Sequence, residues 1–146
     1  MKSIIIIASL FVAFLFIRAT VVKSKPVVDE GKGIIFFEGS WQEALALAKK
    51  ENKLIFLDAY ASWCGPCKMM KYKVFPLSEV GEYFNQNFIN VKMDMEKGEG
   101  PELANKYGVT AYPSLYFIDY TGKVKKYSVG YHNAKQLIGL GQLASK

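Results

Sequence analysis

The chain has 146 residues, of which 51% are hydrophobic, and this fits one globular domain of ordinary size with an extension. Its net charge is +6, but residues 1–23 carry three positive charges and no negative one, so the rest is only mildly basic, at about +3. This small excess, and the fact that Arg18 is the single arginine, argue against a nucleic-acid-binding protein.

Residues 1–23 have the pattern of a targeting segment. Lys2 supplies a positive start, and residues 4–17 form an apolar run of the length of a signal h-region, shorter than the roughly 20 residues of a transmembrane helix. No clear A-x-A cleavage pattern follows. The sequence therefore predicts export to the periplasm or cell envelope, with cleavage near residues 19–24 favoured over a retained anchor in the inner membrane formed by residues 4–17.

Residues 24–33 are polar, contain proline and glycine, and are predicted to be a linker. A single domain is expected over residues 34–146. It should begin with a strand at 34–37, because the run Ile-Ile-Phe-Phe is rich in strand-forming residues. Ser40 and Glu43 then have the spacing of a capping box that opens the first helix.

The apolar stretch 54–60 is predicted to be the central strand, and Asp58 interrupts it. A carboxylate on an apolar strand costs free energy unless it is paired or protonated, and burial would raise its pKa. The alternative that Asp58 lies at a partly exposed strand end stays open at this point.

The only two cysteines of the chain follow directly, in the sequence Trp63-Cys64-Gly65-Pro66-Cys67. A helix is predicted to begin here and to end near Phe75. The free N–H groups and the dipole of a helix N-terminus stabilise an anion, so Cys64 should ionise below the usual thiol pKa of about 8.5. We expect Cys67, one turn further, to be more buried and to form a disulfide with Cys64 reversibly.

Two other interpretations of the cysteine pair carry less weight. A structural zinc ion needs four ligands, but the chain has no second cysteine pair, and His132 is its only histidine. A purely structural disulfide would close a very short loop and so contribute little stability. The pattern thus favours redox chemistry, without a metal or an organic cofactor.

The motif at residues 63–67 resembles the active-site motif of the thioredoxin family, and the resemblance extends over about residues 34–146. It implies an α/β thioredoxin fold, in which helices flank both faces of a central mixed β-sheet. It also implies that Asp58, six residues before Cys64, is a buried acid that accepts the proton of Cys67. Asn90 stands where many thioredoxins carry a lysine, and Lys92, two residues on, shares its strand face.

Further signals place the remaining elements. Ser78 is expected to cap a helix over 79–85, and residues 88–93 alternate as a half-buried strand would. A helix at 102–107 should end at Gly108, and residues 124–129 are expected to form an edge strand. The last helix should follow an N-cap at position 133.

Tyr112 and Pro113 precede a predicted strand. In the family that the chain resembles, this X-Pro bond is cis and faces the cysteines, although an ordinary trans turn is the alternative. The resemblance implies that the Tyr112 backbone pairs with an extended substrate. The substrate would also contact Trp63, Gly65 and Pro66.

The sequence therefore predicts a monomeric protein thiol–disulfide oxidoreductase of the reducing type, with Cys64, Cys67 and Asp58 as its catalytic residues. Its expected partners are substrate proteins that carry disulfides, and an upstream thiol protein or membrane electron donor. Two alternatives stay open: a redox-inert binding or chaperone module with the same fold, and an oxidant that forms disulfides.

Overall fold

The computed structural model describes residues 33–146, so the expected targeting segment and nearly all of the expected linker lie outside it. The elements are α2 (Trp41–Glu51), β1 (Leu54–Tyr60), α3 (Gly65–Lys73), α4 (Ser78–Asn87), β2 (Phe88–Asp94), α5 (Gly100–Tyr107), β3 (Ser114–Ile118), β4 (Val124–Val129) and α6 (Ala134–Ala144). Within these residues, no helix is long and apolar enough to cross a membrane.

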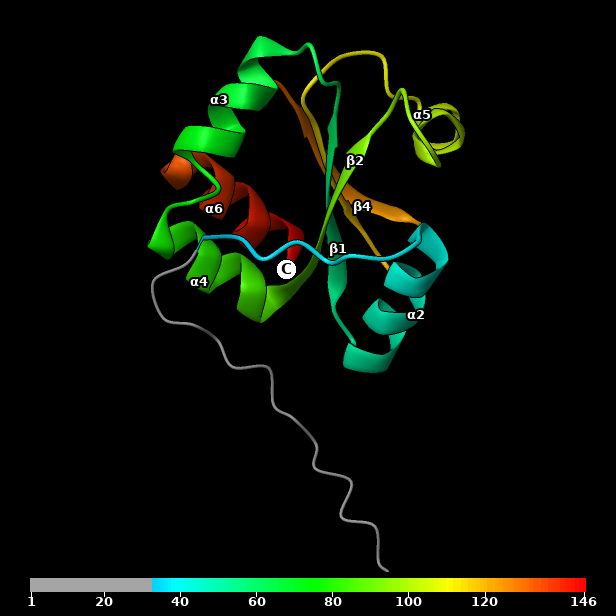
Figure 1. The fold of residues 1–146 in the computed structure, drawn as a ribbon. Helices are drawn as coiled ribbons and strands as arrows, with labels where there is room; N and C mark the ends of the chain where they lie inside the picture. Colours follow the sequence, from blue (N-terminus) through cyan, green and yellow to red (C-terminus); the bar gives the residue numbers. More distant parts are fainter. Residues whose placement is uncertain (1–32) are drawn as a thin grey trace, which may run out of the picture.

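The four strands form one mixed sheet in the order β2-β1-β3-β4. The pair β1–β2 is parallel, and the pairs β1–β3 and β3–β4 are antiparallel. Figure 1 shows α2 and α5 on one face of this sheet and α3, α4 and α6 on the other. The predicted α/β architecture, a mixed sheet between two layers of helices, is therefore confirmed.

Alternate residues of β1 enter two different cores. Ile55, Leu57 and Ala59 pack with α2 and α5, whereas Phe56 packs with α3, α4 and α6. Side chains alternate between the faces of a strand, so Asp58 points to the same side as Phe56. The central strand thus aims one carboxyl group into the layer that holds α3.

Two helices begin with the capping boxes that their sequences favour. The Ser40 side chain accepts a hydrogen bond from the Glu43 N–H, and Asn133 accepts one from the Gln136 N–H. In both cases the side chain three residues further on accepts a hydrogen bond from the backbone N–H of the cap residue. At the other end of α5, Gly108 adopts the left-handed conformation of a C-cap, as predicted.

The predicted strand at 34–37 is wrong. This segment is extended and runs beside β2, but only the Phe37 N–H donates to a β2 carbonyl, that of Asn90. Its other hydrogen bonds do not go to the backbone of β2: the Ile34 N–H donates to the Phe75 carbonyl, the Ile35 N–H donates to Asn85 Oδ1, and the Ile35 carbonyl accepts from Asn90 Nδ2. Because side-chain amides replace the backbone partners, no ladder forms.

Two further predictions need correction. Ser78 is the first residue of α4 rather than its N-cap; Leu77 holds that position and makes no side-chain capping bond. The strand β2 is not half-buried, since residues 88–91 are all buried. The extended segment and the helices cover both faces of this strand, so its alternating pattern does not separate an inner from an outer face.

Candidate active site

Cys64 and Cys67 form a disulfide at the N-terminus of α3, directly after the short loop that connects β1 to this helix. Their Cα atoms lie 5.3 Å apart. Cys64 is the N-cap residue, and its sulfur accepts a hydrogen bond from the Cys67 N–H at 3.2 Å. The predicted position of Cys64 at a helix start is confirmed, and its sulfur already lies where a helix N-terminus favours negative charge.

The two cysteine residues are nearly equally buried. Cys64 is 3% exposed and Cys67 is 6% exposed, so the expectation that Cys67 would be the more buried of the two is wrong for this oxidised state. Tyr60 and Tyr112 pack against the cluster formed by Ala61 and the cysteines, and they shield the disulfide from solvent. Gly65 and Pro66, in contrast, are exposed in the first turn of α3.

Asp58 is buried within β1, with 5% of its surface exposed. Its Oδ1 atom has no hydrogen-bond partner among residues 33–146. Burial raises the pKa of Asp58 to about 7, and the positive charge of Lys92 opposes this shift. The alternative of a partly exposed Asp58 is thus excluded, and this carboxyl group can gain or lose a proton near neutral pH.

A groove of about 510 Å³ connects Asp58 with Cys67. Its lining includes Asp58, Cys67, Tyr60 and Lys92. Both the acid predicted to accept a proton and the cysteine predicted to lose one therefore line the same groove, from different elements. The groove gives solvent and protons a route to this otherwise buried pair.

The peptide bond between Tyr112 and Pro113 is cis, as the resemblance implied. Pro113 is fully buried, and its carbonyl accepts a hydrogen bond from the N–H of Gly130 at 2.8 Å. Tyr112 touches the cysteine cluster on one side and the ring of Trp63 on the other, with the two ring centroids 5.8 Å apart. The loop before β3 is thereby fixed beside the disulfide.

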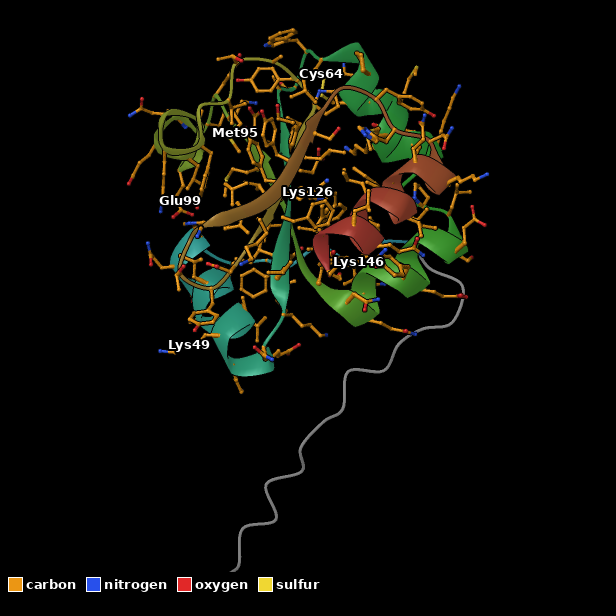
Figure 2. All side chains as sticks on the ribbon, turned by 180° about the vertical axis from the view of Figure 1, so that it is seen from behind. Lys49, Cys64, Met95, Glu99, Lys126 and Lys146 are labelled. Carbon is orange, nitrogen blue, oxygen red and sulfur yellow. A yellow bond between two sulfur atoms is a disulfide. The ribbon has the colours of Figure 1, made fainter. Side chains whose placement is uncertain are left out.

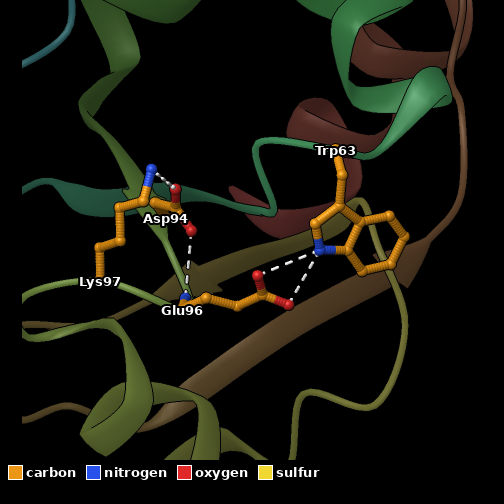
Figure 3. Close-up of polar contacts among 4 residues, drawn as sticks. All are labelled: Trp63, Asp94, Glu96 and Lys97. Atoms are coloured by element: carbon orange, nitrogen blue, oxygen red, sulfur yellow. Dashed lines mark hydrogen bonds and ion pairs between the residues drawn. The ribbon is translucent and has the colours of Figure 1, made fainter.

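Trp63 is 66% exposed, and a carboxylate anchors it from the loop after β2 (Figure 3). The indole N–H donates to both carboxylate oxygens of Glu96, each at 3.0 Å. The Glu96 N–H donates in turn to Asp94 Oδ1, and Asp94 forms an ion pair with Lys97. Sequence reasoning missed Glu96 and Asp94, because nothing in a single sequence identifies which acid of a polar loop meets the tryptophan.

The structure therefore brings the predicted site residues together at one end of the sheet. Figure 2 shows Cys64 at this end of the molecule. Asp58 lies in β1, which precedes the disulfide, Tyr112 packs against the cysteine cluster, and the Trp63 ring contacts Tyr112. Among residues 33–146, no group of three or more histidine, cysteine, aspartate or glutamate side chains is arranged to hold a metal ion.

Comparison with known proteins identifies the family. The thioredoxin family model matches residues 34–140. Over 73 residues the chain is 40% identical to a thioredoxin of Echinococcus granulosus, and the match covers 50% of this chain and 63% of that protein. Chloroplastic thioredoxin Y2 of Arabidopsis thaliana is 42% identical over 69 residues, which are 47% of this chain and 38% of the relative. The chain thus spans less than two thirds of the length of these relatives.

Solved structures agree with this assignment. A candidate disulphide-isomerase from Bacteroides thetaiotaomicron is 50% identical, with a TM-score of 0.70, and the match covers 78% of this chain and 94% of that one. The reduced C-terminal domain of DsbD from Neisseria meningitidis is 26% identical, with a TM-score of 0.58, over 69% of this chain and 90% of that domain. On its sequence and its fold, this chain belongs to the thioredoxin family, with a Cys-x-x-Cys pair at disulfide distance.

Proposed function

We propose that this protein is a thiol–disulfide oxidoreductase that reduces disulfides in partner proteins. One observation carries the proposal: a Cys64–Cys67 disulfide caps the N-terminus of α3 and shares a groove with the buried Asp58. A helix N-terminus lowers the free energy of a thiolate, and a carboxyl group with a pKa of about 7 can take up a proton at neutral pH. Nucleophile, resolving thiol and proton acceptor are thus all present.

The reaction starts from the dithiol form. The Cys64 thiolate attacks one sulfur of the substrate disulfide, a Cys64–substrate disulfide forms, and the other substrate sulfur leaves as a thiolate. The Cys67 sulfur then attacks Cys64, which forms the Cys64–Cys67 bond and releases the second substrate thiolate. Two electrons pass from the cysteine pair to the substrate, whose thiolates take protons from the surroundings. The oxidised form described above is the product state.

Asp58 acts in the second step. Cys67 must lose its proton before it can attack, and the ionised Asp58 carboxylate is a base in the groove that both residues line. Burial raises the pKa of Asp58 to about 7, so the base form of this carboxyl group is accessible at neutral pH. Transfer proceeds directly or through one water molecule in the groove.

Substrate binding falls to the residues around the disulfide. The exposed Trp63, Gly65 and Pro66 form the surface that a partner chain meets, and the backbone of Tyr112 pairs with the partner's extended segment. The rim of the site is thus suited to a polypeptide substrate.

We place the protein in the periplasm or cell envelope, on the basis of the apolar run at residues 4–17. An upstream thiol protein or membrane donor then returns it to the dithiol form. The Gly-Pro pair between the cysteines supports the reducing direction, because it resembles the reducing members of the family. Glutathione titration tests this: we expect a midpoint potential of about −270 mV, the value of thioredoxin itself, and a potential near that of strong oxidants would reverse the direction.

Insulin-disulfide reduction tests the activity. The wild type should reduce insulin with dithiothreitol as donor, and Cys64→Ser should be inactive. Cys67→Ser should accumulate mixed disulfides that mass spectrometry identifies, because it attacks but cannot resolve. If the Cys64→Ser variant still performs the protein's function in the cell, the protein is a redox-inert binding module instead.

A further inference from the structure

The outer face of α3 is basic and partly apolar. Its sequence carries Lys68, Lys71 and Lys73 but no acidic residue, and all three lysines are exposed. Met69 and Tyr72 are also exposed, at 43% and 68%. A solvated helix of a monomer usually mixes charges of both signs, so this face has the composition of a docking surface rather than that of a merely soluble one.

The groove beside the disulfide extends this basic face. Lys68 and Lys71 line it from α3, and Lys92 and Lys97 line it from β2 and the loop that follows. The two α3 lysines form no ion pair with a carboxylate of residues 33–146, and Lys71 lies only over the ring of Tyr72. Their positive charge is therefore available to a partner.

Acidic groups gather on the other side of the disulfide. Glu96 and Glu99 lie in the loop between β2 and α5, whereas Asp94 ends β2 and lines the same groove as the α3 lysines. Figure 1 shows α5 and α3 on opposite faces of the sheet. Lys97 is the only base among these loop residues, and it pairs with Asp94. The rim of the site is thus polarised, with the positive side along α3.

We infer that the α3 face and its groove bind an acidic segment of the substrate protein next to its disulfide. The lysines attract carboxylates over a distance of about 10 Å at moderate salt, which raises the association rate and orients the encounter. Met69 and Tyr72 supply apolar contact once the partner has docked. This inference rests on the proposed exchange activity and names the class of substrate that it favours.

Two disulfide-bonded peptides of the same length test the inference, one with aspartates and one with serines beside the disulfide. Stopped-flow fluorescence gives the second-order rate constant for oxidation of the reduced protein by each peptide. We expect the ratio of the acidic to the neutral rate constant to be about tenfold at low salt and to approach unity at high salt. Taking a ratio removes any change in the reactivity of Cys64 itself.

The double variant Lys68→Glu/Lys71→Glu should bring this ratio below unity, and Lys68→Gln/Lys71→Gln should give an intermediate value. Lys49→Glu/Lys50→Glu is the matched control: both lysines are exposed on α2, and Figure 2 shows Lys49 at the far end of the molecule from Cys64. It makes the same change in net charge and should keep the ratio of the wild type.

Two results overturn the inference alone: equal rate constants for both peptides in the wild type, or the same fall of the ratio in the α2 control. In either case the neutral peptide is still reduced, so the proposed function stands. If neither peptide is reduced at all, the exchange activity fails, and the docking inference fails with it.

Discussion

Asp58 of β1 lies directly opposite Lys92 of β2 in the parallel strand pair, and both residues line the groove that reaches Cys67. Burial raises the pKa of Asp58, and the charge of Lys92 partly opposes this. Lys92 is exposed, with its ammonium 5.2 Å from the centre of the Phe36 ring. The lysine thus adjusts the acidity of the carboxyl group without being buried beside it.

Lys92→Gln should therefore raise the pKa of Asp58 above its value of about 7. Loss of the nearby positive charge removes the only influence that favours the ionised form, while burial remains. Carbon-13 NMR of the Asp58 carboxyl group measures the titration. Lys50→Gln, on the far helix, should leave it unchanged, and an unaltered Asp58 titration in Lys92→Gln would show that Lys92 has no such part.

Asp58→Asn should increase stability at alkaline pH. In the unfolded chain the carboxyl group titrates near 3.8, whereas in the folded chain it titrates near 7, so the folded state binds more protons between these values. The wild type consequently loses stability as the pH rises from about 4 to about 7, by about 4 kcal/mol for a shift of this size.

The asparagine variant lacks this loss. Urea denaturation at pH 3 and pH 8 measures this difference. The free energy of unfolding of the variant, relative to that of the wild type, should be roughly 4 kcal/mol higher at pH 8 than at pH 3. The same variant should resolve mixed disulfides more slowly at neutral pH, because Cys67 lacks its base. If the free energy of unfolding of the two proteins depends on pH in the same way, the burial of an ionisable Asp58 is contradicted.

Glu96→Ala should release Trp63 from its anchor. The bond between the indole N–H and the carboxylate is exposed, so its loss should cost only about 1 kcal/mol in stability. The indole side chain should nonetheless become more mobile, and the rate constant for a peptide disulfide should fall by a few-fold. Trp41 is buried elsewhere and serves as an internal reference in indole NMR spectra. An unchanged Trp63 signal would contradict the anchoring.

Two glycines of α6 make a matched pair. A Cβ atom at Gly139 meets nothing within 4 Å, whereas at Gly141 it would lie 2.8 Å from Tyr83 Cε1 and 3.2 Å from Phe88 Cε2. Gly139→Ala should stabilise the protein by about 0.5–1 kcal/mol through helix propensity. Gly141→Ala should destabilise it by about 1–3 kcal/mol, because the rings must shift. Thermal denaturation compares the two, and equal effects would be inconsistent with this packing of α6 on α4.

The sequence was sufficient to predict most of this fold, because its local signals agree with the tertiary structure. Apolar β1, the capping boxes at Ser40 and Asn133, and the glycine after α5 each have a local cause. The segment 34–37 shows the limit of such reasoning. Its residues favour a strand, but Asn85 and Asn90 take the hydrogen bonds that a ladder would need, and that competition is visible only in three dimensions.

The same limit applies to the site. The motif predicted that Cys64 lies at a helix start and that Asp58 lies nearby, because strand and helix fix both positions locally. Glu96 comes from a loop distant in sequence from Trp63, and its orientation depends on Asp94. The near-equal burial of the two cysteine residues likewise depends on Tyr60 and Tyr112, which pack against the cluster that contains them.

The rate of Cys64 alkylation as a function of pH tests the central claim most directly, namely that the helix N-terminus holds this sulfur as a thiolate. The measurement uses the reduced Cys67→Ser variant, in which Cys64 is the only thiol, with iodoacetamide as the probe. The account predicts an apparent Cys64 pKa at least about one unit below the free thiol value of 8.5. A pKa at or above that value would contradict it.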